Sequence, residues 1–177
     1  LFSSLISTFG TLDGLHLLDL FAGSGAIGVE ALSRGAALVE SVESNSISAN
    51  VCKQNFELLS NTEGIGKFKV HEKTVFEFLN HFASNSYEII YIDPPYLPDT
   101  RSIGSKEIYD NEMTTEEHVE MLNAIKNARS KVIISGYPSS LYNKHLKGWK
   151  TAKKEIVNHS SQKKSKEKRI EQLWMNY

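Results

Sequence analysis

The sequence has little cysteine, no long apolar run and almost no net charge. Cys52 is the single cysteine among 177 residues, which excludes a disulfide framework and a cysteine-rich zinc site. It lies within Asn50-Val51-Cys52-Lys53-Gln54, where we expect a small buried thiol rather than a nucleophile. No apolar segment approaches the roughly 18 residues that span a bilayer, and no secretory leader with a small-residue cleavage site is recognisable. We therefore expect a cytoplasmic protein with no membrane partner.

The net charge of −1 argues against a uniformly basic nucleic-acid binder, but it averages two different regions. Residues 1–143 hold 18 acidic and 10 basic side chains, whereas residues 144–177 hold 3 acidic and 10 basic ones. A chain with an acidic body and a basic C-terminal end can present a basic surface to a charged target even though its net charge is close to zero. Hydrophobic residues make up 40% of the chain, so we expect a single domain over residues 1–177 with a buried core.

Apolar runs of strand length alternate along the chain with stretches of helical periodicity. Strands are predicted at 15–20, 38–43, 68–70, 88–93, 131–135, 149–158 and 170–176, and helices at 25–33, 47–59, 74–82, 115–128 and 138–146. This alternation predicts an α/β fold with a mostly parallel sheet covered on both faces. No helix separates the last two strands, so they are predicted to form an antiparallel hairpin at the sheet edge.

A glycine-rich loop follows the first predicted strand. Gly23, Gly25 and Gly28 have the spacing Gly-x-Gly-x-x-Gly, which lets the backbone approach a ligand at the carboxyl edge of a doubly wound sheet. The spacing alone also fits a dinucleotide site or a tight turn. Asp19, just before the loop, disfavours a pyrophosphate, and Glu43 ends the second strand where a carboxylate can accept hydrogen bonds from ribose hydroxyls. The two acids favour S-adenosylmethionine, whose amine and sulfonium are cationic.

Residues 18–36, LDLFAGSGAIGVEALSRGA, and the segment Val42-Glu43-Ser44-Asn45 resemble class I S-adenosylmethionine-dependent methyltransferases. More narrowly, they resemble the bacterial 16S rRNA guanine-N2 enzymes. The resemblance implies a Rossmann-like class I methyltransferase fold, with Glu43 holding the ribose and the 21–25 loop passing under the methionine moiety. Thr74 stands near the place where those enzymes usually have an acid for the adenine. The residues implied for the cofactor are Asp19, Phe21, Ala22, Gly23, Ser24, Gly25, Glu43, Ser44, Thr74 and Val75.

The tetrapeptide Asp93-Pro94-Pro95-Tyr96 ends the central predicted strand, at the same sheet edge as the glycine loop. Paired prolines can also serve simply as a rigid turn. The tetrapeptide resembles the (Asn/Asp)-Pro-Pro-(Tyr/Phe) motif of enzymes that methylate exocyclic amino groups of nucleobases. The resemblance implies that the Asp93 side chain and the Pro94 carbonyl accept hydrogen bonds from the amine. The prolines would hold these acceptors rigidly, and Tyr96 would stack on the base.

The two halves of the chain resemble different enzymes. The second half resembles DNA adenine-N6 methylases in segments 93–101, 109–114, 133–137, 141–142, 148–149, 159–161 and 169–177. Because this likeness extends through loops, we expect adenine N6 in DNA to be the target. Guanine N2 of 16S rRNA is the alternative, and a non-catalytic nucleic-acid-binding module with the same fold is a third interpretation.

Only 49 residues separate Glu43 from Asp93, so no target-recognition insertion fits between the two motifs. Specificity would then come from the long loops, a segment before Leu1 or a partner. Lysines crowd the connection between the last two strands, where they form either a solvated loop or a phosphate-contacting one. The residues predicted to contact nucleic acid are Arg101, Lys106, Lys163, Lys164, Lys166 and Lys168. The six histidines lack metal-ligand spacing, so no metal is expected.

Overall fold

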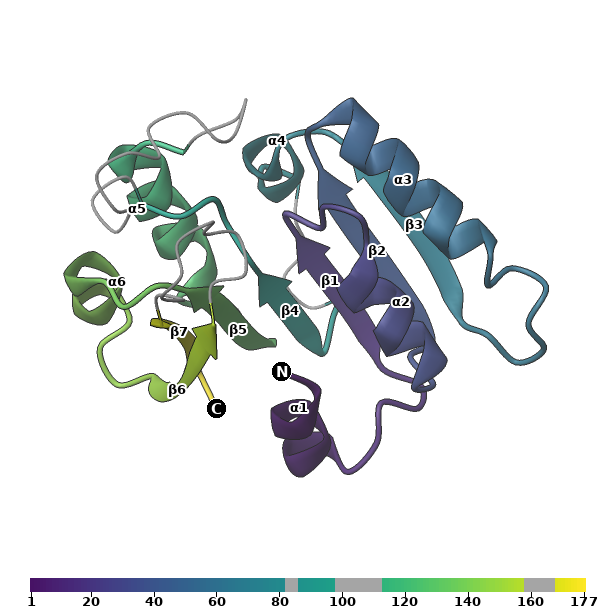
Figure 1. Ribbon diagram of the computed structural model, residues 1–177, viewed down its shortest axis with the longest axis horizontal. Coiled ribbons are helices and arrows are strands. Elements are labelled where there is room, and N and C mark those ends of the chain that lie inside the picture. The colour runs from purple at the N-terminus through teal and green to yellow at the C-terminus, as the bar shows by residue number, and fades with distance from the viewer. Residues whose placement is uncertain (82–85, 98–112, 158–167) are drawn as a thin grey trace. The chain divides into compact units, whose positions relative to one another are not determined.

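The computed structural model describes residues 1–81, 86–97, 113–157 and 168–177, with only the backbone described at 156, 157, 168 and 169. Within these residues seven strands form a sheet in the order β3-β2-β1-β4-β5-β7-β6 (Figure 1). The strands are β1 (His16–Leu20), β2 (Leu38–Glu43), β3 (Lys67–Glu72), β4 (Ile89–Ile92), β5 (Lys131–Gly136), β6 (Lys150–Val157) and β7 (Lys168–Met175). The helices are α1 (Phe2–Phe9), α2 (Ala26–Ser33), α3 (Ser46–Glu57), α4 (Val75–Leu79), α5 (Thr115–Ile125) and α6 (Ser140–His145).

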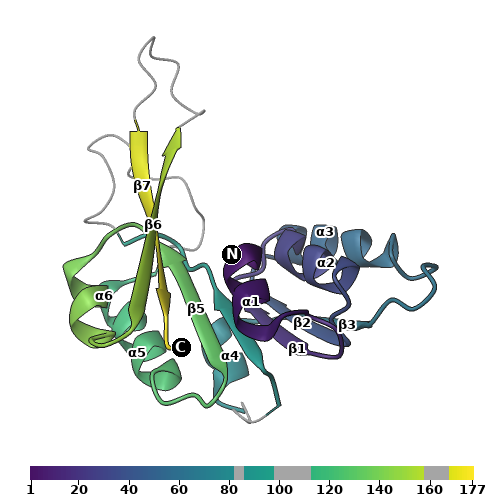
Figure 2. The ribbon, with the colours of Figure 1, turned by 90° about the horizontal axis from the view of Figure 1, so that it is seen from below.

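The predicted α/β fold is confirmed, including the antiparallel pair at one end of the sheet. β1 pairs in parallel with β2 and with β4, and β2 pairs in parallel with β3. β7 pairs antiparallel with both β5 and β6, so the last strand lies between them. Strands β6 and β7 form a long antiparallel ribbon (Figure 2).

Helix α1 was not predicted from the sequence. Phe2, Leu5, Ile6 and Phe9 have the spacing of an apolar helical face, but the helix is only eight residues long and its Leu1 N-cap makes no side-chain hydrogen bond. The other helices match their predicted positions to within a few residues at each end. Side-chain caps mark several of their starts: Asn45 accepts a hydrogen bond from the Ser48 amide, and Thr74 and Thr114 form capping boxes with residues three positions on.

The described chain divides into two compact units. Unit 1 comprises Leu1–Ile92 with Ala128–Lys131, and unit 2 comprises Asp93–Asn127 with Val132–Tyr177. The expectation of one catalytic domain over residues 1–177 stays a prediction. None of the helices in the described ranges has the length and apolar character needed to cross a membrane.

Unit 1 is built around the parallel strands β1, β2 and β4. Strands β1 and β4 are almost entirely buried. Helix α2 packs on β1 and β2, and α3 packs beside it on β2 and β3, on the same face of the sheet (Figures 1 and 2). This burial explains why the two strands are mostly apolar rather than alternating, with Asp19 of β1 as the charged exception. Leu20 pairs with both Val42 and Ile92, so the chain leaves β1, β2 and β4 at one common edge of the sheet.

Unit 2 has a buried core in which aromatic side chains of β7 and α6 pack together beside β5. Val132, Ile133 and Ile134 are fully buried, and Trp174 of β7 is only 1% exposed. The Trp174 indole N–H donates to the Asn143 side-chain oxygen at 2.9 Å, which satisfies the one polar atom of this buried ring. Tyr142 of α6 packs against Trp174 with ring centroids 5.0 Å apart. This packing holds α6 beside the end of β5, and Tyr142 of α6 and residues 135–137 line one pocket with residues 94–97 of the second motif.

Candidate active site

The glycine loop between β1 and α2 is an irregular turn with three left-handed residues. Phe21, Gly23 and Gly25 have φ of 64°, 55° and 77°, and Phe21 is the one non-glycine residue among the described ones with positive φ. The turn is tied to β2, because the Ala22 amide donates to the Val42 carbonyl at 3.0 Å. A left-handed aromatic residue costs free energy that surrounding contacts must offset, and such strain clusters at functional sites.

The two glycines of this turn have different surroundings. A Cβ at Gly25 would lie 2.5 Å from the Cys52 sulfur and 3.3 Å from the Phe56 ring, whereas a Cβ at Gly23 would meet nothing within 4 Å. Gly25 therefore lets α2 start tightly against α3. Gly23 presents bare backbone to open space, as required where a ligand lies against a loop.

Glu43 links the end of β2 to the glycine loop. Its carboxylate accepts hydrogen bonds from the amides of Gly23 and Asn45, each at 2.8 Å. An ionised carboxylate has about four acceptor positions, so two remain for ligand hydroxyls. The side chain is only partly buried, which leaves it accessible. The sequence predicted Glu43 and the loop to act together, and the structure joins them directly.

Asp19 and Cys52 lie in the interior beneath the loop. Asp19 is 1% exposed on β1, and Cys52 of α3 is fully buried. Burial raises the pKa of the Cys52 thiol to about 11, and the nearby Asp19 and Glu43 carboxylates add to that rise. A thiol with such a pKa is protonated at neutral pH and is a poor nucleophile. The expectation of a structural Cys52 therefore agrees with its burial and its pKa.

The remaining predicted cofactor residues lie at the ends of β2 and β3. Ser44 is exposed directly after Glu43, and the Lys73 amide donates to the Glu43 carbonyl at 3.2 Å. Thr74 caps α4, since its hydroxyl accepts a hydrogen bond from the Glu77 amide at 3.1 Å. Val75 is buried. The backbone of the 73–75 segment is thus near Glu43. The Thr74 side chain caps α4, and this position carries threonine instead of the acid that the resemblance implies for the adenine.

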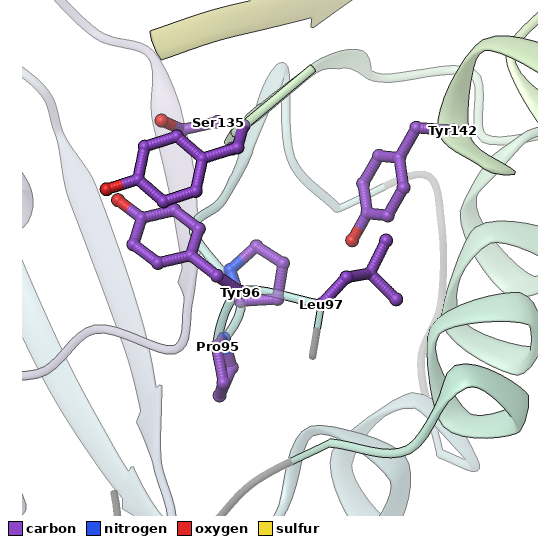
Figure 3. A pocket seen from close by; sticks show the side chains of 8 residues that line it. Pro95, Tyr96, Leu97, Ser135 and Tyr142 are labelled. Atoms are coloured by element: carbon purple, nitrogen blue, oxygen red, sulfur yellow. The ribbon is translucent and has the colours of Figure 1, made fainter. Parts of the chain in front are cut away.

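In unit 2, the Asp-Pro-Pro-Tyr segment forms one wall of a pocket. The pocket is lined by Pro94, Pro95, Tyr96, Leu97, Ser135, Gly136, Tyr137 and Tyr142. Figure 3 shows the Tyr96 ring on the left and Tyr142 on the right, with the Tyr142 hydroxyl pointing toward Leu97. The Tyr96 ring stacks on the Tyr137 ring with centroids 4.1 Å apart and an interplanar angle of 25°. The walls are therefore flat rings and proline, a lining suited to an aromatic ligand.

A buried hydrogen bond holds the opposite side of this pocket. The Tyr142 hydroxyl lies 2.8 Å from Nδ1 of His118, and both side chains are buried. Burial raises the pKa of the Tyr142 hydroxyl well above its usual range, and the nearby Asp93 carboxylate raises it further. Tyr142 is therefore a neutral phenol close to the first residue of the motif. Asp93 itself is exposed, and Pro94 is buried.

Three residues of this site had no assigned role in the sequence interpretation: Tyr137, Tyr142 and His118. Ser135 and Gly136, at the end of β5, line the same pocket. Tyr137 follows β5 directly, so the rule that ligands bind at the carboxyl ends of parallel strands was a usable signal. His118 had no such signal, because only packing of α5 against α6 brings it to Tyr142. Of the predicted nucleic-acid contacts, Arg101, Lys106, Lys163, Lys164 and Lys166 lie outside the described residues, and the Lys168 side chain is not described.

The strand order and the turn after β1 define a Rossmann-like methyltransferase fold. Magnesium protoporphyrin IX methyltransferase from Synechocystis, solved with bound SAM, matches with a TM-score of 0.59 and 16% identity over 97% of this chain and 74% of its own. At that identity the likeness shows the fold alone. The chain belongs to the family described as Conserved hypothetical protein 95, which matches residues 1–161.

Two relatives share more sequence over shorter segments. Ribosomal RNA small subunit methyltransferase D from Buchnera aphidicola is 35% identical over 79 residues, which is 45% of this chain and 39% of the relative. Ribosomal RNA large subunit methyltransferase K/L from Shewanella frigidimarina is 29% identical over 112 residues, which is 63% of this chain and 15% of the relative. The matched segments thus cover well under half the length of either relative.

Proposed function

We propose that this protein is an S-adenosylmethionine-dependent methyltransferase that acts on an exocyclic amino group of a base in ribosomal RNA. The observation that carries the proposal is the Asp-Pro-Pro-Tyr segment at the end of β4, which lines an aromatic pocket together with the residues after β5. Among exocyclic amines, guanine N2 is favoured by the likeness of residues 18–36 to the 16S rRNA guanine-N2 enzymes.

The residues of unit 1 fit S-adenosylmethionine. Gly23 leaves open space over its backbone, and Glu43 keeps acceptor positions for ribose hydroxyls beside that space. Asp19 adds negative charge near the loop, which complements a cationic amine and sulfonium. The cofactor supplies a methyl group that is electrophilic because it is carried on a sulfonium. We assign the other predicted cofactor residues, including Ser44 and the 73–75 segment, to the same site.

The residues of unit 2 would make a poor nucleophile reactive. The lone pair of a base amine is delocalised into the ring. Hydrogen bonds from this amine to the Asp93 carboxylate and the Pro94 carbonyl would draw the nitrogen toward tetrahedral geometry and localise the lone pair. Pro94 and Pro95 fix the backbone that carries both acceptors, so little reorganisation is needed during the reaction. As the bond from nitrogen to the methyl carbon forms, the bond from that carbon to sulfur would break, which leaves a neutral thioether. The amine proton becomes acidic only at that stage, so a weak acceptor such as the Asp93 carboxylate or water suffices and no strong base is required.

Two targets compete for this chemistry. The relatives named above are both ribosomal RNA methyltransferases, and this supports the rRNA alternative over the initial expectation of adenine N6 in DNA. The DNA target remains the second candidate because segments of the C-terminal half, such as 133–137 and 141–142, resemble DNA adenine-N6 methylases.

The test is a transfer assay with methyl-labelled S-adenosylmethionine and three substrates: unmodified small-subunit rRNA, unmodified large-subunit rRNA and unmethylated DNA. Digestion to nucleosides then identifies the product by mass. N2-methylguanosine in rRNA is the expected product, and N6-methyladenine in DNA would replace the proposal by its competitor. Absence of S-adenosylmethionine binding in calorimetry would reject both enzymatic functions and favour a non-catalytic binding module.

A further inference from the structure

Tyr137 is one of the residues that line the pocket in unit 2. It directly follows β5, and its ring stacks on Tyr96 with centroids 4.1 Å apart. Two rings at this separation are in van der Waals contact, so nothing fits between them. A base inserted between them would require ring planes roughly 7 Å apart, which is twice the 3.5 Å contact distance of carbon atoms.

We propose that Tyr137 is the second base-binding ring of this pocket, and that the target base inserts between Tyr96 and Tyr137. In the structure the Tyr137 ring covers a face of Tyr96 that the base would otherwise contact. Insertion would replace one ring–ring contact by two ring–base contacts, so the flat faces stay covered throughout. This inference rests on the proposed function for the nature of the ligand, a nucleobase.

Tyr137 is the ring that moves. Tyr96 follows two prolines, whose fixed φ restricts the backbone before it. Tyr137 is half-buried in the bend between β5 and α6, so we assign the outward movement to its ring. The far side of the pocket is rigid, because Tyr142 is buried and hydrogen-bonded to His118 at 2.8 Å. A base that displaces Tyr137 would therefore be held on a fixed Tyr96.

In this arrangement, the residues that give affinity for a base differ from those that contact its amino group. Stacking on aromatic rings tolerates any base, because every base has a π-face. Tyr137 therefore contributes to holding the base, whereas the acceptors at Asp93 and Pro94 contact the amine. Loss of the Tyr137 ring should raise KM for the nucleic acid much more than it lowers kcat.

The test compares Tyr137→Ala and Tyr137→Leu with Tyr137→Phe, which keeps the ring. The leucine variant preserves apolar bulk and replaces the alanine variant if that one does not fold. Tyr177→Ala is the control, because it removes a tyrosine that does not line the pocket. The probe is a short single-stranded RNA that carries one 2-aminopurine. This base has an exocyclic amine, and its fluorescence emission falls when it stacks on another ring.

We expect the alanine and leucine variants to bind this probe at least about fivefold more weakly, the lower end of the effect of losing one base–aromatic stack. The phenylalanine and Tyr177→Ala proteins should match the wild type, and S-adenosylmethionine affinity should be unchanged in all four. Unchanged or tighter probe binding by the ring-free variants would overturn the inference, as would failure of the wild type to bind the probe. Probe binding that depends on Tyr137, in a wild-type protein that methylates none of the three substrates, would reject the proposed function and keep the base-binding role.

Discussion

The carboxylate of Glu43 accepts a hydrogen bond from the backbone amide of Gly23 at 2.8 Å, across 20 residues of sequence. A second amide, that of Asn45, donates to the other carboxylate oxygen at the same distance. One acidic side chain thus ties the end of β2 to the most open part of the glycine loop. The same carboxylate is the proposed partner of the ribose hydroxyls, so the proposed function gives Glu43 a second role besides shaping the loop.

Replacement of Glu43 should therefore weaken cofactor binding. Glu43→Ala removes the acceptor for both amides and for the ribose, and hydrogen bonds to charged groups are worth about 1.5–3 kcal/mol each. We expect the dissociation constant for S-adenosylmethionine to rise about tenfold or more in calorimetry. Glu43→Gln, which keeps one acceptor oxygen, should fall between the alanine variant and the wild type.

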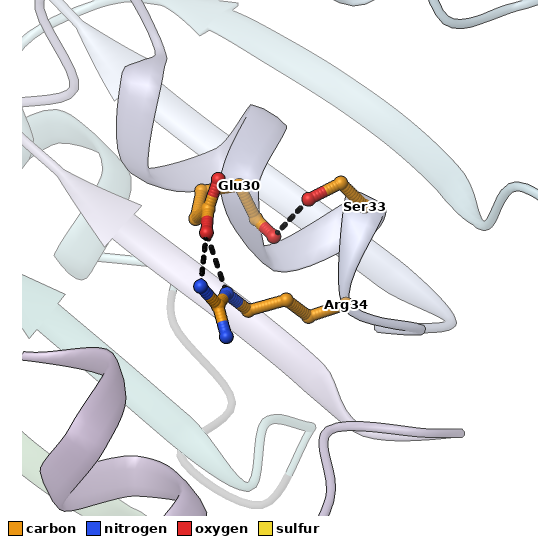
Figure 4. A network of polar contacts seen from close by, with 3 residues as sticks. All are labelled: Glu30, Ser33 and Arg34. Carbon is orange, nitrogen blue, oxygen red and sulfur yellow. Dashed lines mark hydrogen bonds and ion pairs between the residues drawn. The ribbon is translucent and has the colours of Figure 1, made fainter.

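Glu30 provides the matched control for a lost carboxylate. It accepts from Arg34 Nε at 2.6 Å on the surface of α2 (Figure 4), and both side chains are about 40% exposed. Exposed ion pairs contribute about 0–1 kcal/mol, so Glu30→Gln should leave cofactor affinity and stability close to wild type. Equal losses of affinity in the Glu30 and Glu43 variants would contradict the role of Glu43.

Two glycine substitutions in the same loop should differ in their main effect: Gly25→Ala should mainly lower stability, and Gly23→Ala should mainly weaken cofactor binding. Gly25→Ala combines a left-handed backbone, which costs about 1–2 kcal/mol, with a Cβ 2.5 Å from the Cys52 sulfur, and overpacking adds about 1–3 kcal/mol. Gly23→Ala carries the backbone cost alone, but its methyl group enters the open space of the proposed ligand site. Urea denaturation should show the larger loss of stability for Gly25→Ala. Calorimetry should show weaker binding for Gly23→Ala beyond what its stability explains, and similar unfolding curves would contradict the difference in packing.

Cys52 should be inert in the folded protein. With its pKa raised to about 11 by burial, only about one thiol in a thousand is ionised at pH 8, and the side chain is fully buried. A thiol-specific reagent at pH 8 should therefore label native protein far more slowly than protein in urea. The chain has a single cysteine, so the signal has one source. Labelling at the rate of a free thiol in the native state would show that the α3 environment is not closed.

The Tyr142 hydroxyl should contribute to the stability of unit 2. Tyr142→Phe removes the buried hydrogen bond to His118, and loss of such a bond costs about 1–3 kcal/mol. We expect a lower midpoint of urea denaturation, whereas Tyr137→Phe, which alters a half-buried hydroxyl in the same pocket, should have a smaller effect. Equal stability of Tyr142→Phe and the wild type would show that His118 and Tyr142 do not depend on each other.

Much of the fold could be predicted because its signals are local. The buried strands β1 and β4 are short, mostly apolar runs, and the α3 and α5 starts carry polar N-cap residues, so the positions of these elements follow from neighbouring residues. α1 was missed because its eight residues give only one short apolar face. The order of the last strands depends on pairing over long distances, and only the structure shows β7 between β5 and β6.

The candidate site divides in the same way. Gly23, Gly25, Glu43 and the 93–96 segment could be named from the sequence, because turn geometry and charge at strand ends are set by residues close together in the chain. Thr74 was named as a cofactor residue on its position alone, and the structure shows that its side chain caps α4. The target base stays a prediction: the loop likenesses favoured adenine N6 in DNA, whereas the relatives that match the chain are ribosomal RNA methyltransferases.

The sequence by itself determined the α/β architecture, the glycine loop and the motif at the end of β4, since each depends on the pattern of a short segment. Only the tertiary structure decided what surrounds those segments. It placed Cys52 and Phe56 against Gly25, left Gly23 open, stacked Tyr137 on Tyr96 and paired Tyr142 with His118. These contacts join residues that are tens of positions apart, and side-chain packing, which no local pattern records, sets their geometry.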